Sequence, residues 1–137
     1  MEPQNTLFAY GTLLVPRIWR AVTGCDCPSQ PATLPGFAIY RVKDADFPGI
    51  VSAGRKSKVE GRIFSGLDEE TLFRLDTYED EFYVRREVTL LDAAGNPVES
   101  QAYVVPDRFE DILSREPWTL EWFREKAMDN YLFRHGF

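Results

Sequence analysis

The sequence predicts an α+β fold with a strongly curved or barrel-like sheet of about six short strands, one helix between strands and one terminal helix. Short apolar segments, several with alternating polarity, are separated by turns typical of hairpins, which makes most strand connections local. Only two segments show clear helical periodicity and capping signals. No series of alternating strands and helices indicates a parallel sheet.

The size of the chain fits one domain spanning residues 1–137. Hydrophobic residues make up 44% and aromatic residues 14% of the chain, which is enough for a substantial core. We expect residues 1–5 to be a flexible tail. We find no repeat, low-complexity segment or linker.

Charge and hydropathy restrict the partners and the location. The formal net charge is −6 and the sequence pI is about 4.8, which argues against binding to nucleic acid or to an anionic membrane surface. No apolar run approaches the roughly 20 residues that span a bilayer. The polar N-terminus does not resemble a signal peptide, so we expect a cytoplasmic protein. The sequence does not indicate an oligomeric state.

The strands follow from apolar and β-branched runs between turn residues. The first strand ends at Gly11, and residues 13–23 form either a short helix or an irregular connection. Residues 25–31 are expected to be a loop. We expect strands or short buried segments at 7–10, 32–42 with a bend at Pro35 and Gly36, 47–51, 58–64, 83–91 and 98–105, the last two forming a hairpin.

The two helices have recognisable N-termini. Asp68 is a favourable N-cap for a helix that extends to about Asp80. Thr119 is the expected N-cap of a terminal helix that extends to about Arg134. Phe123, Ala127 and Tyr131 recur at helical spacing and give this second helix a packing face.

One carboxylate lies on the apolar side of the first helix. Glu79 follows Leu75 by four residues and Leu72 by seven, so it shares their inward face. Burial and the helix C-terminus both raise a carboxyl pKa, which makes a better base near neutral pH. Two alternatives remain open: an ion pair of Glu79 with Arg85 or Arg86, or Asp76 as the inward carboxylate.

The other candidate feature is the turn that follows the first strand. Gly11 lets the chain turn with its amide groups exposed, and successive N–H groups bind anions or carboxylates. A plain strand-ending turn is the alternative. The phosphate-loop pattern is absent.

Cysteine and histidine content excludes several kinds of site. Cys25 and Cys27 are too few for a disulfide framework, and no second cysteine pair is present, so we expect reduced thiols rather than a metal site. The single histidine, His135, lies near the C-terminus, which disfavours a Ser-His-Asp triad and excludes a multi-histidine metal site. A carboxylate is therefore the expected base of any catalytic site.

Several segments together resemble the gamma-glutamylcyclotransferase-like superfamily. Residues 7–13 (LFAYGTL) are similar to its Tyr-Gly-Ser/Thr-Leu signature. Residues 75–79 (LDTYE), followed by 83–88 (YVRREV), are similar to its catalytic segment. Segments at 34–37, 47–51 and 59–61 resemble further family segments in the same order. The aromatic terminal helix resembles the plant branch first described as avirulence-induced proteins.

The resemblance implies a compact mixed β-barrel with flanking helices and an enzyme that needs neither cofactor nor metal. Its substrate would be a small molecule with a γ-glutamyl group. The α-amine would attack the side-chain carbonyl and release 5-oxoproline, with Glu79 as general acid and base. The substrate-binding residues implied are Tyr10, Gly11, Thr12, Leu13, Leu14, Val15 and Tyr103.

The sequence departs from the family pattern after the glutamate, where Asp80 replaces the frequent glycine. Leu14 and Val15 are more apolar than expected for a very polar peptide substrate such as glutathione. The alternative functions are an acyl or amine transferase on the same scaffold, with an external nucleophile, and a non-catalytic small-molecule-binding module.

Overall fold

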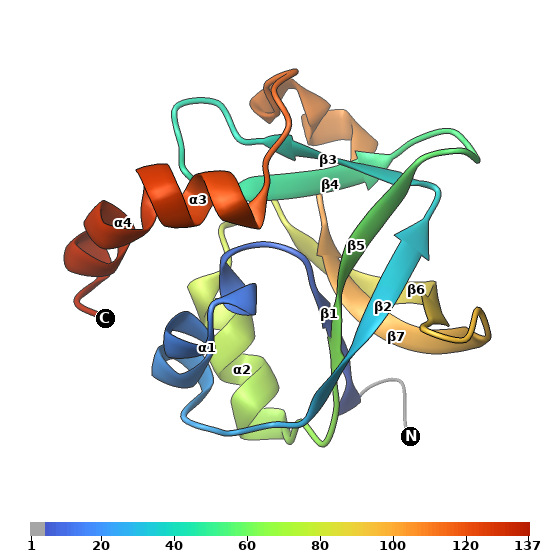
Figure 1. Ribbon diagram of the computed structural model, residues 1–137, viewed down its shortest axis with the longest axis horizontal. Helices are drawn as coiled ribbons and strands as arrows, with labels where there is room; N and C mark the ends of the chain where they lie inside the picture. Colours follow the sequence, from blue (N-terminus) through green and yellow to red (C-terminus); the bar gives the residue numbers. More distant parts are fainter. Residues whose placement is uncertain (1–4) are drawn as a thin grey trace.

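A computed structural model describes residues 5–137, so most of the expected N-terminal tail, residues 1–4, lies outside the described residues. Asn5 is described, and its carbonyl accepts a hydrogen bond from the Leu67 amide at 3.0 Å. Five strands form one sheet in the order β1-β5-β2-β6-β7, and β3 and β4 form a second sheet (Figure 1). The strands are β1 Leu7–Ala9, β2 Ser29–Pro35, β3 Phe37–Arg41, β4 Pro48–Ser52, β5 Lys58–Phe64, β6 Val84–Asp92 and β7 Pro97–Val104.

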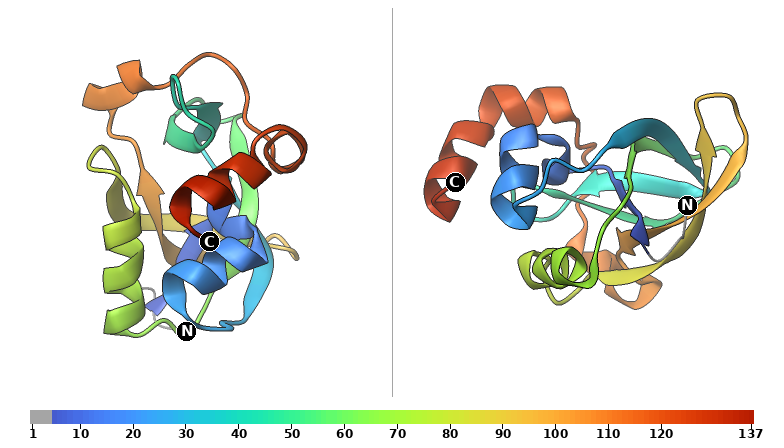
Figure 2. Two further views of the ribbon diagram at one scale, coloured as in Figure 1. Left: turned by 90° about the vertical axis from the view of Figure 1, so that its left-hand side faces the viewer. Right: turned by 90° about the horizontal axis from the view of Figure 1, so that it is seen from below.

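Helical segments lie between and after these strands. Figures 1 and 2 show α1, α2 and the terminal pair α3–α4 on one side of the molecule, with the curved sheet on the other. In the described part of the chain, no helix is long and apolar enough to span a membrane. The helical segments are η2 Thr12–Leu14, α1 Pro16–Thr23, α2 Glu69–Tyr78, η3 Asp107–Ile112, α3 Leu120–Lys126 and α4 Met128–His135.

The larger sheet curls until its two edge strands meet. All four pairs of neighbouring strands in this sheet are antiparallel. The two edge strands, β1 and β7, therefore run in the same direction. Next to β1, the hydroxyl of Thr6 forms a buried hydrogen bond of 2.7 Å with the hydroxyl of Ser100 in β7. The predicted α+β fold with a barrel-like sheet is confirmed, but this sheet has five strands where about six were expected, and two more strands form the second sheet.

The prediction of one strand at 32–42 is wrong, because the structure divides these residues between two strands in different sheets. Residues up to Pro35 pair with β5 and β6, whereas β3 pairs with β4 alone. Gly36, with φ of +83°, lies in the left-handed region and turns the chain out of the first sheet. The bend was visible in the sequence, but apolar patterning does not specify which sheet the second half joins.

Strand β1 is buried on both faces, which places its C-terminal end between the barrel and the helices. Leu7 and Ala9 pack in the cluster formed with the helices, and Phe8 and Tyr10 pack in the barrel interior. This alternation follows the two-residue period of a strand. The chain therefore leaves β1 at the junction of the two cores, where the candidate site lies.

The helix beginning at Asp68 is confirmed, and its cap is formed as expected. The Asp68 carboxylate accepts a hydrogen bond from the Thr71 amide at 2.8 Å. The helix α2 ends at Tyr78, slightly earlier than predicted.

The prediction of a single helix from Thr119 to Arg134 is wrong, because the backbone at Ala127 (φ −134°, ψ −23°) separates α3 from α4. The predicted N-cap is confirmed, since the Thr119 hydroxyl accepts a hydrogen bond from the Trp122 amide at 3.0 Å. Phe123, Ala127 and Tyr131 are all buried, as their spacing predicted. The residues near Ala127 include no proline or glycine, so nothing local in the sequence indicates the break.

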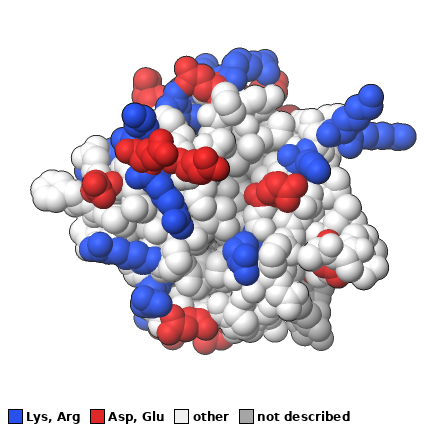
Figure 3. Space-filling model, in the orientation of Figure 1, with Lys and Arg blue, Asp and Glu red and all other residues white. Residues whose placement is uncertain are grey.

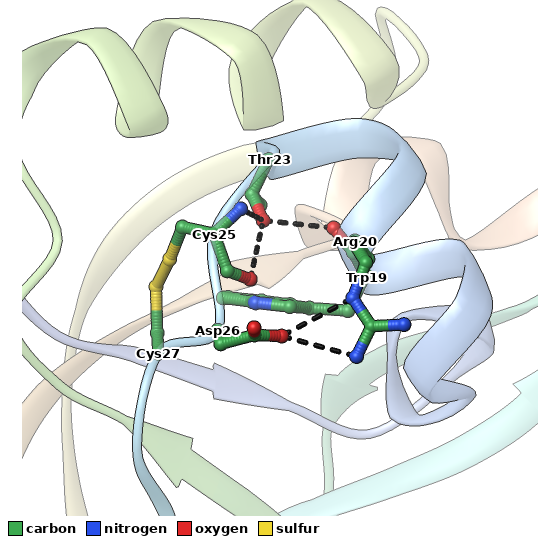
Figure 4. A network of polar contacts seen from close by, with 6 residues as sticks. All are labelled: Trp19, Arg20, Thr23, Cys25, Asp26 and Cys27. Atoms are coloured by element: carbon green, nitrogen blue, oxygen red, sulfur yellow. Dashed lines mark hydrogen bonds and ion pairs between the residues drawn. A yellow bond between two sulfur atoms is a disulfide. The ribbon is translucent and has the colours of Figure 1, made fainter.

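The expectation of reduced thiols is also wrong, because Cys25 and Cys27 form a disulfide (Figure 4). The chain bends after α1, where the Thr23 hydroxyl accepts a hydrogen bond from the Cys25 amide at 3.2 Å. Arg20 also pairs with Asp26 at 3.0 Å. The bend leaves the two cysteine Cα atoms 5.5 Å apart, a spacing that a disulfide spans. The number of cysteines in the sequence does not indicate how this loop bends.

A glycine in β5 makes the close packing of β1 possible. A methyl group on Gly61 would lie 2.8 Å from the Phe8 ring and would overlap the Ala9 carbonyl oxygen. We expect Gly61→Ala to lower the free energy of unfolding by about 3 kcal/mol, because backbone atoms would have to move. Gly54→Ala is the matched control, since nothing lies within 4 Å of its added methyl group. Urea denaturation that shows equal, small effects for both variants would contradict this description of the packing.

Candidate active site

The turn after β1 is a short 3-10 segment with free amide groups. The Leu14 amide donates to the Gly11 carbonyl and the Val15 amide to the Thr12 carbonyl, each at 3.0 Å. The first N–H groups of such a segment have no partner within it. Among residues 5–137, no protein acceptor takes the amide hydrogens of Gly11, Thr12 and Leu13. These three donors are available to an anion or a carbonyl oxygen.

Gly11 is required here by a close contact rather than by a left-handed backbone. Its φ is −125°, which other residues also adopt. A methyl group on Gly11 would lie 2.8 Å from the Pro48 ring carbon Cγ. The expectation that this glycine permits the turn is thereby refined: it lets Pro48 at the start of β4 lie directly against the turn.

Glu79 occupies the C-cap of α2. Its amide donates to the Leu75 carbonyl at 3.1 Å, and its own backbone is extended (φ −75°, ψ 147°). The residue is half-buried and lines the same cavity as the turn. Burial, together with the negative charges of Asp80 and Asp76, raises the pKa of Glu79 from 4.5 to about 8. Glu79 therefore changes its ionisation in the pH range in which a general acid–base group works best.

The alternative of an ion pair between Glu79 and Arg85 or Arg86 is contradicted, because both arginines have other partners. Arg85 binds Asp76 through two hydrogen bonds of 2.9 and 3.1 Å, and the Arg86 guanidinium lies over the Phe37 ring. Among the described residues, no arginine or lysine forms an ion pair with Glu79. The carboxyl group is free to act on a ligand.

Asp76, the other candidate inward carboxylate, has a positioning role. It accepts a hydrogen bond of 2.6 Å from the Tyr103 hydroxyl in addition to those from Arg85. Desolvation raises the pKa of Asp76, but the hydrogen bonds from Arg85 and Tyr103 outweigh it and leave this pKa below its usual value. Asp76 therefore stays ionised and fixes the Tyr103 side chain at the wall of the cavity.

Tyrosine hydroxyls connect the turn to the surrounding elements. The Tyr10 hydroxyl donates to the Tyr103 carbonyl at 2.7 Å, which joins β1 to β7. The hydroxyls of Thr12 and Tyr78 are hydrogen bonded at 2.8 Å, and Tyr78 is also bonded to the hydroxyl of Tyr131. Desolvation by burial raises the pKa of the Tyr78 and Tyr103 hydroxyls, so they remain neutral donors and acceptors.

Most of the predicted site residues meet around one cavity of about 170 Å³. Tyr10, Gly11, Thr12, Leu13, Glu79 and Tyr103 all line it. Leu14 and Val15 do not. Val15 is buried in the core against the helices. Leu14 faces a separate groove between α3 and β5 (Figure 3), where charges of both signs surround a largely uncharged centre.

The sequence patterns did not indicate the other residues that line this cavity. Besides Leu7, Phe8, Ala9 and Asp80, these are Phe47, Pro48, Tyr78, Tyr83, Tyr131 and His135. Tyr131 was recognised as part of a packing face, and Tyr78 directly precedes Glu79, but neither pattern indicates a hydroxyl in a site. His135 was set aside because it lies near the chain end. The break between α3 and α4, which the sequence does not indicate, precedes the helix that carries Tyr131 and His135.

Among residues 5–137, no lysine or arginine lines the cavity. Glu79 and Asp80 are the carboxylates among its lining residues, and the rest are aromatic, apolar or hydroxyl-bearing apart from His135. Desolvation and the nearby Arg134 charge lower the pKa of His135, so its ring is neutral at pH 7. Any anionic group of a ligand must therefore be held by backbone amides and hydroxyls.

Comparisons with known proteins agree with this fold. A family model described as "Gamma-glutamyl cyclotransferase, AIG2-like" matches residues 7–120, and the chain belongs to this family. Within it, the chain is 27% identical to AIG2-like protein D of Arabidopsis thaliana over 130 residues, which cover 93% of this chain and 84% of that protein. It is 29% identical to Protein AIG2 B of the same plant, again over 130 residues, which cover 93% and 75% of the two chains.

Two solved structures show that the fold is shared. A solution structure from Arabidopsis thaliana covers 98% of this chain and 81% of its own, with a TM-score of 0.73 and 24% identity. A structure named gamma-glutamyl cyclotransferase covers 73% of this chain and 65% of its own, with a TM-score of 0.63 and 18% identity. The resemblance to the superfamily and to its AIG2-like branch is thus confirmed.

The raised pKa of Glu79 has a consequence for stability. Between about pH 4.5 and pH 8 the folded protein holds a proton on Glu79 that the unfolded chain has released, so stability falls as the pH rises through this window. We expect Glu79→Gln to unfold like the wild type near pH 4 but to be roughly 1–2 kcal/mol more stable near pH 8.5, allowing for partial exposure. Urea denaturation at both pH values tests this, with the exposed Glu81→Gln as control. If Glu79→Gln differed from the wild type in the free energy of unfolding by the same amount at both pH values, the raised pKa of Glu79 would be contradicted.

Proposed function

We propose that this protein releases 5-oxoproline from γ-glutamyl amines by intramolecular attack of the α-amine, with Glu79 as general acid and base. The observation that carries the proposal is the cavity shared by the free amides of Gly11, Thr12 and Leu13 and by a carboxyl group whose pKa is about 8. Family membership supports cyclotransferase-like chemistry in general. The assignment of roles to individual residues is our inference from the geometry.

The turn and the tyrosines would hold the substrate in a folded pose. The three amides of the turn are suited to bind the α-carboxylate or the side-chain carbonyl of the glutamyl group. Tyr103, whose hydroxyl is fixed by Asp76, lines the same cavity. A folded γ-glutamyl group has its amine close to its own carbonyl, so ring closure gains from proximity and orientation.

The proton transfers balance around Glu79. The α-nitrogen enters as an ammonium and ends as a lactam N–H, so it loses two protons, and the leaving nitrogen gains two as it becomes an ammonium. Ionised Glu79 takes the first proton, which makes the amine nucleophilic, and returns it to the leaving nitrogen as the C–N bond breaks. The second proton leaves the ring nitrogen, and the released amine takes up a proton from solvent.

The charge of the cavity favours amines over peptides as leaving groups. A peptide such as glutathione brings a terminal carboxylate, and the cavity offers it no lysine or arginine but two carboxyl groups, Glu79 and Asp80. An uncharged or cationic amine avoids this repulsion. We therefore favour γ-glutamyl amines as the substrate class.

The role of Glu79 is tested by one substitution. We expect Glu79→Gln to lower the rate of 5-oxoproline formation from a γ-glutamyl amine by a factor of about 100 to 10,000, because the amide neither accepts nor returns the proton. Glu81→Gln, an exposed residue outside the cavity, should keep the wild-type rate. Mass spectrometry of the products measures both. A fully active Glu79→Gln enzyme would rule out this mechanism, and a new amide formed with added amine would indicate acyl transfer instead.

The pH profile provides a second test. Glu79 must be ionised to accept a proton, so we expect kcat/KM to rise with pH with a midpoint near 8 in the free enzyme. The ammonium of bound substrate favours the ionised carboxylate, which should give kcat a lower midpoint. A profile of kcat/KM that is flat between about pH 6 and pH 9 would contradict the assignment of Glu79 as the base.

A further inference from the structure

We propose that α4 is the specificity element of this protein and that His135, at its end, limits the size of the amine that the cavity accepts. This inference depends on the proposed cyclotransferase function. Neither Tyr131 nor His135, the residues of α4 that line the cavity, was predicted from the sequence to belong to the site. Short amines would be the preferred leaving groups.

The helix α4 lies outside the segment that the family model matches. The match ends at residue 120, whereas α4 spans Met128–His135. Even so, Tyr131 and His135 line the cavity together with Glu79. The turn and Glu79 lie within residues 7–120, which the family model matches, whereas α4 lies beyond them but is included in the solution structure that covers 98% of this chain. Because α4 lines the cavity without carrying Glu79 or the turn, it is suited to alter substrate choice without altering the chemistry.

Contacts from several elements hold α4 in place. The Tyr131 hydroxyl is bonded to that of Tyr78, the residue next to Glu79, and Tyr78 is bonded to Thr12 of the turn. Farther along the helix, Arg134 forms an ion pair of 2.7 Å with Asp46. These attachments reach α2, the turn and the loop after β3. The helix α4 is therefore part of the packed structure, and both views in Figure 2 show it beside α1.

His135 lies at the mouth of the cavity and not at its inner end. Thr12 and Tyr103 are 6% and 5% exposed, whereas His135 and Asp80 are exposed residues. All γ-glutamyl substrates share the same glutamyl half, which the buried turn would hold. The amine is the part that varies, and an amine of any length can extend only toward the open end. His135 is therefore placed to contact the amine.

Neighbouring rings restrict the movement of the His135 side chain. Its ring centre lies 4.2 Å from that of Tyr131 and 5.3 Å from that of Phe137. The end of the helix is itself tied to α1, because Arg17 donates to the Phe137 carbonyl at 2.6 Å. The cavity behind His135 is only about 170 Å³, below the usual range for drug-sized ligands. A ring held at this mouth narrows the path for a bulky amine.

The test compares leaving amines of increasing size. We would measure 5-oxoproline release by the full chain from the γ-glutamyl derivatives of methylamine, butylamine and benzylamine. We expect His135→Ala to raise kcat/KM for the benzylamine derivative relative to the methylamine derivative by about tenfold, as typical for relief of one steric contact. The readout is the ratio of the two kcat/KM values, which a change that affects both derivatives equally leaves unaltered.

Phe133→Ala is the matched control, because Phe133 lies on the same helix, is 86% exposed and does not line the cavity. Its ratio of benzylamine to methylamine activity should equal that of the wild type. An unchanged or lower ratio for His135→Ala would overturn the inference while leaving the cyclotransferase function intact. If the wild type released no 5-oxoproline from any of the three compounds, the proposed function itself would be wrong, and this inference with it.

Discussion

The burial of β1 on both faces is the constraint on which the rest of the structure depends. This strand of three residues separates the barrel interior from the core against the helices. It can do so because Gly61 lets it approach β5 and because Gly11 lets Pro48 pack against its C-terminal turn. The free amides of the turn are therefore held at the junction of the two cores. Their position is set by packing on all sides and not by the turn alone.

Two carboxylates near the end of α2 have different environments, and this difference defines the site. Asp76 is paired with Arg85 and hydrogen bonded to Tyr103, so it is ionised and structural. Glu79, three residues later, leaves the helix at its C-cap and faces the cavity with a raised pKa. Groups whose surroundings move their pKa values in opposite directions often take different roles in a site. Here one positions a tyrosine and the other remains available to accept a proton.

Local patterns in the sequence predicted the elements whose structure depends on local chemistry. The strand at 58–64 agrees with its predicted bounds, and the caps at Asp68 and Thr119 form the expected hydrogen bonds. Alternation predicts a strand and a capping residue predicts a helix start because neighbours along the chain decide both. Glu79 was likewise predicted to face inward from its spacing to Leu72 and Leu75.

Features that depend on tertiary contacts were not predictable in this way. The break at Ala127 and the division of residues 32–42 between two sheets depend on where distant segments lie, and the disulfide depends on how the loop after α1 bends. Helical spacing placed Tyr131 on a packing face, and His135 lies near the chain end, so neither was predicted to line the cavity. The apolar residues Leu14 and Val15, included by their place next to the turn, face elsewhere.

The central claim is that the turn and Glu79 form a single site for the glutamyl group. The most direct measurement is a titration of the ¹⁵N-labelled protein with 5-oxoproline, followed through its backbone amide resonances. We expect the largest shifts at Gly11, Thr12 and Leu13, together with a change in the titration of the Glu79 carboxyl group. Shifts confined to residues outside the cavity, such as Leu14, Arg62 and Arg124 in the groove between α3 and β5, would contradict the claim.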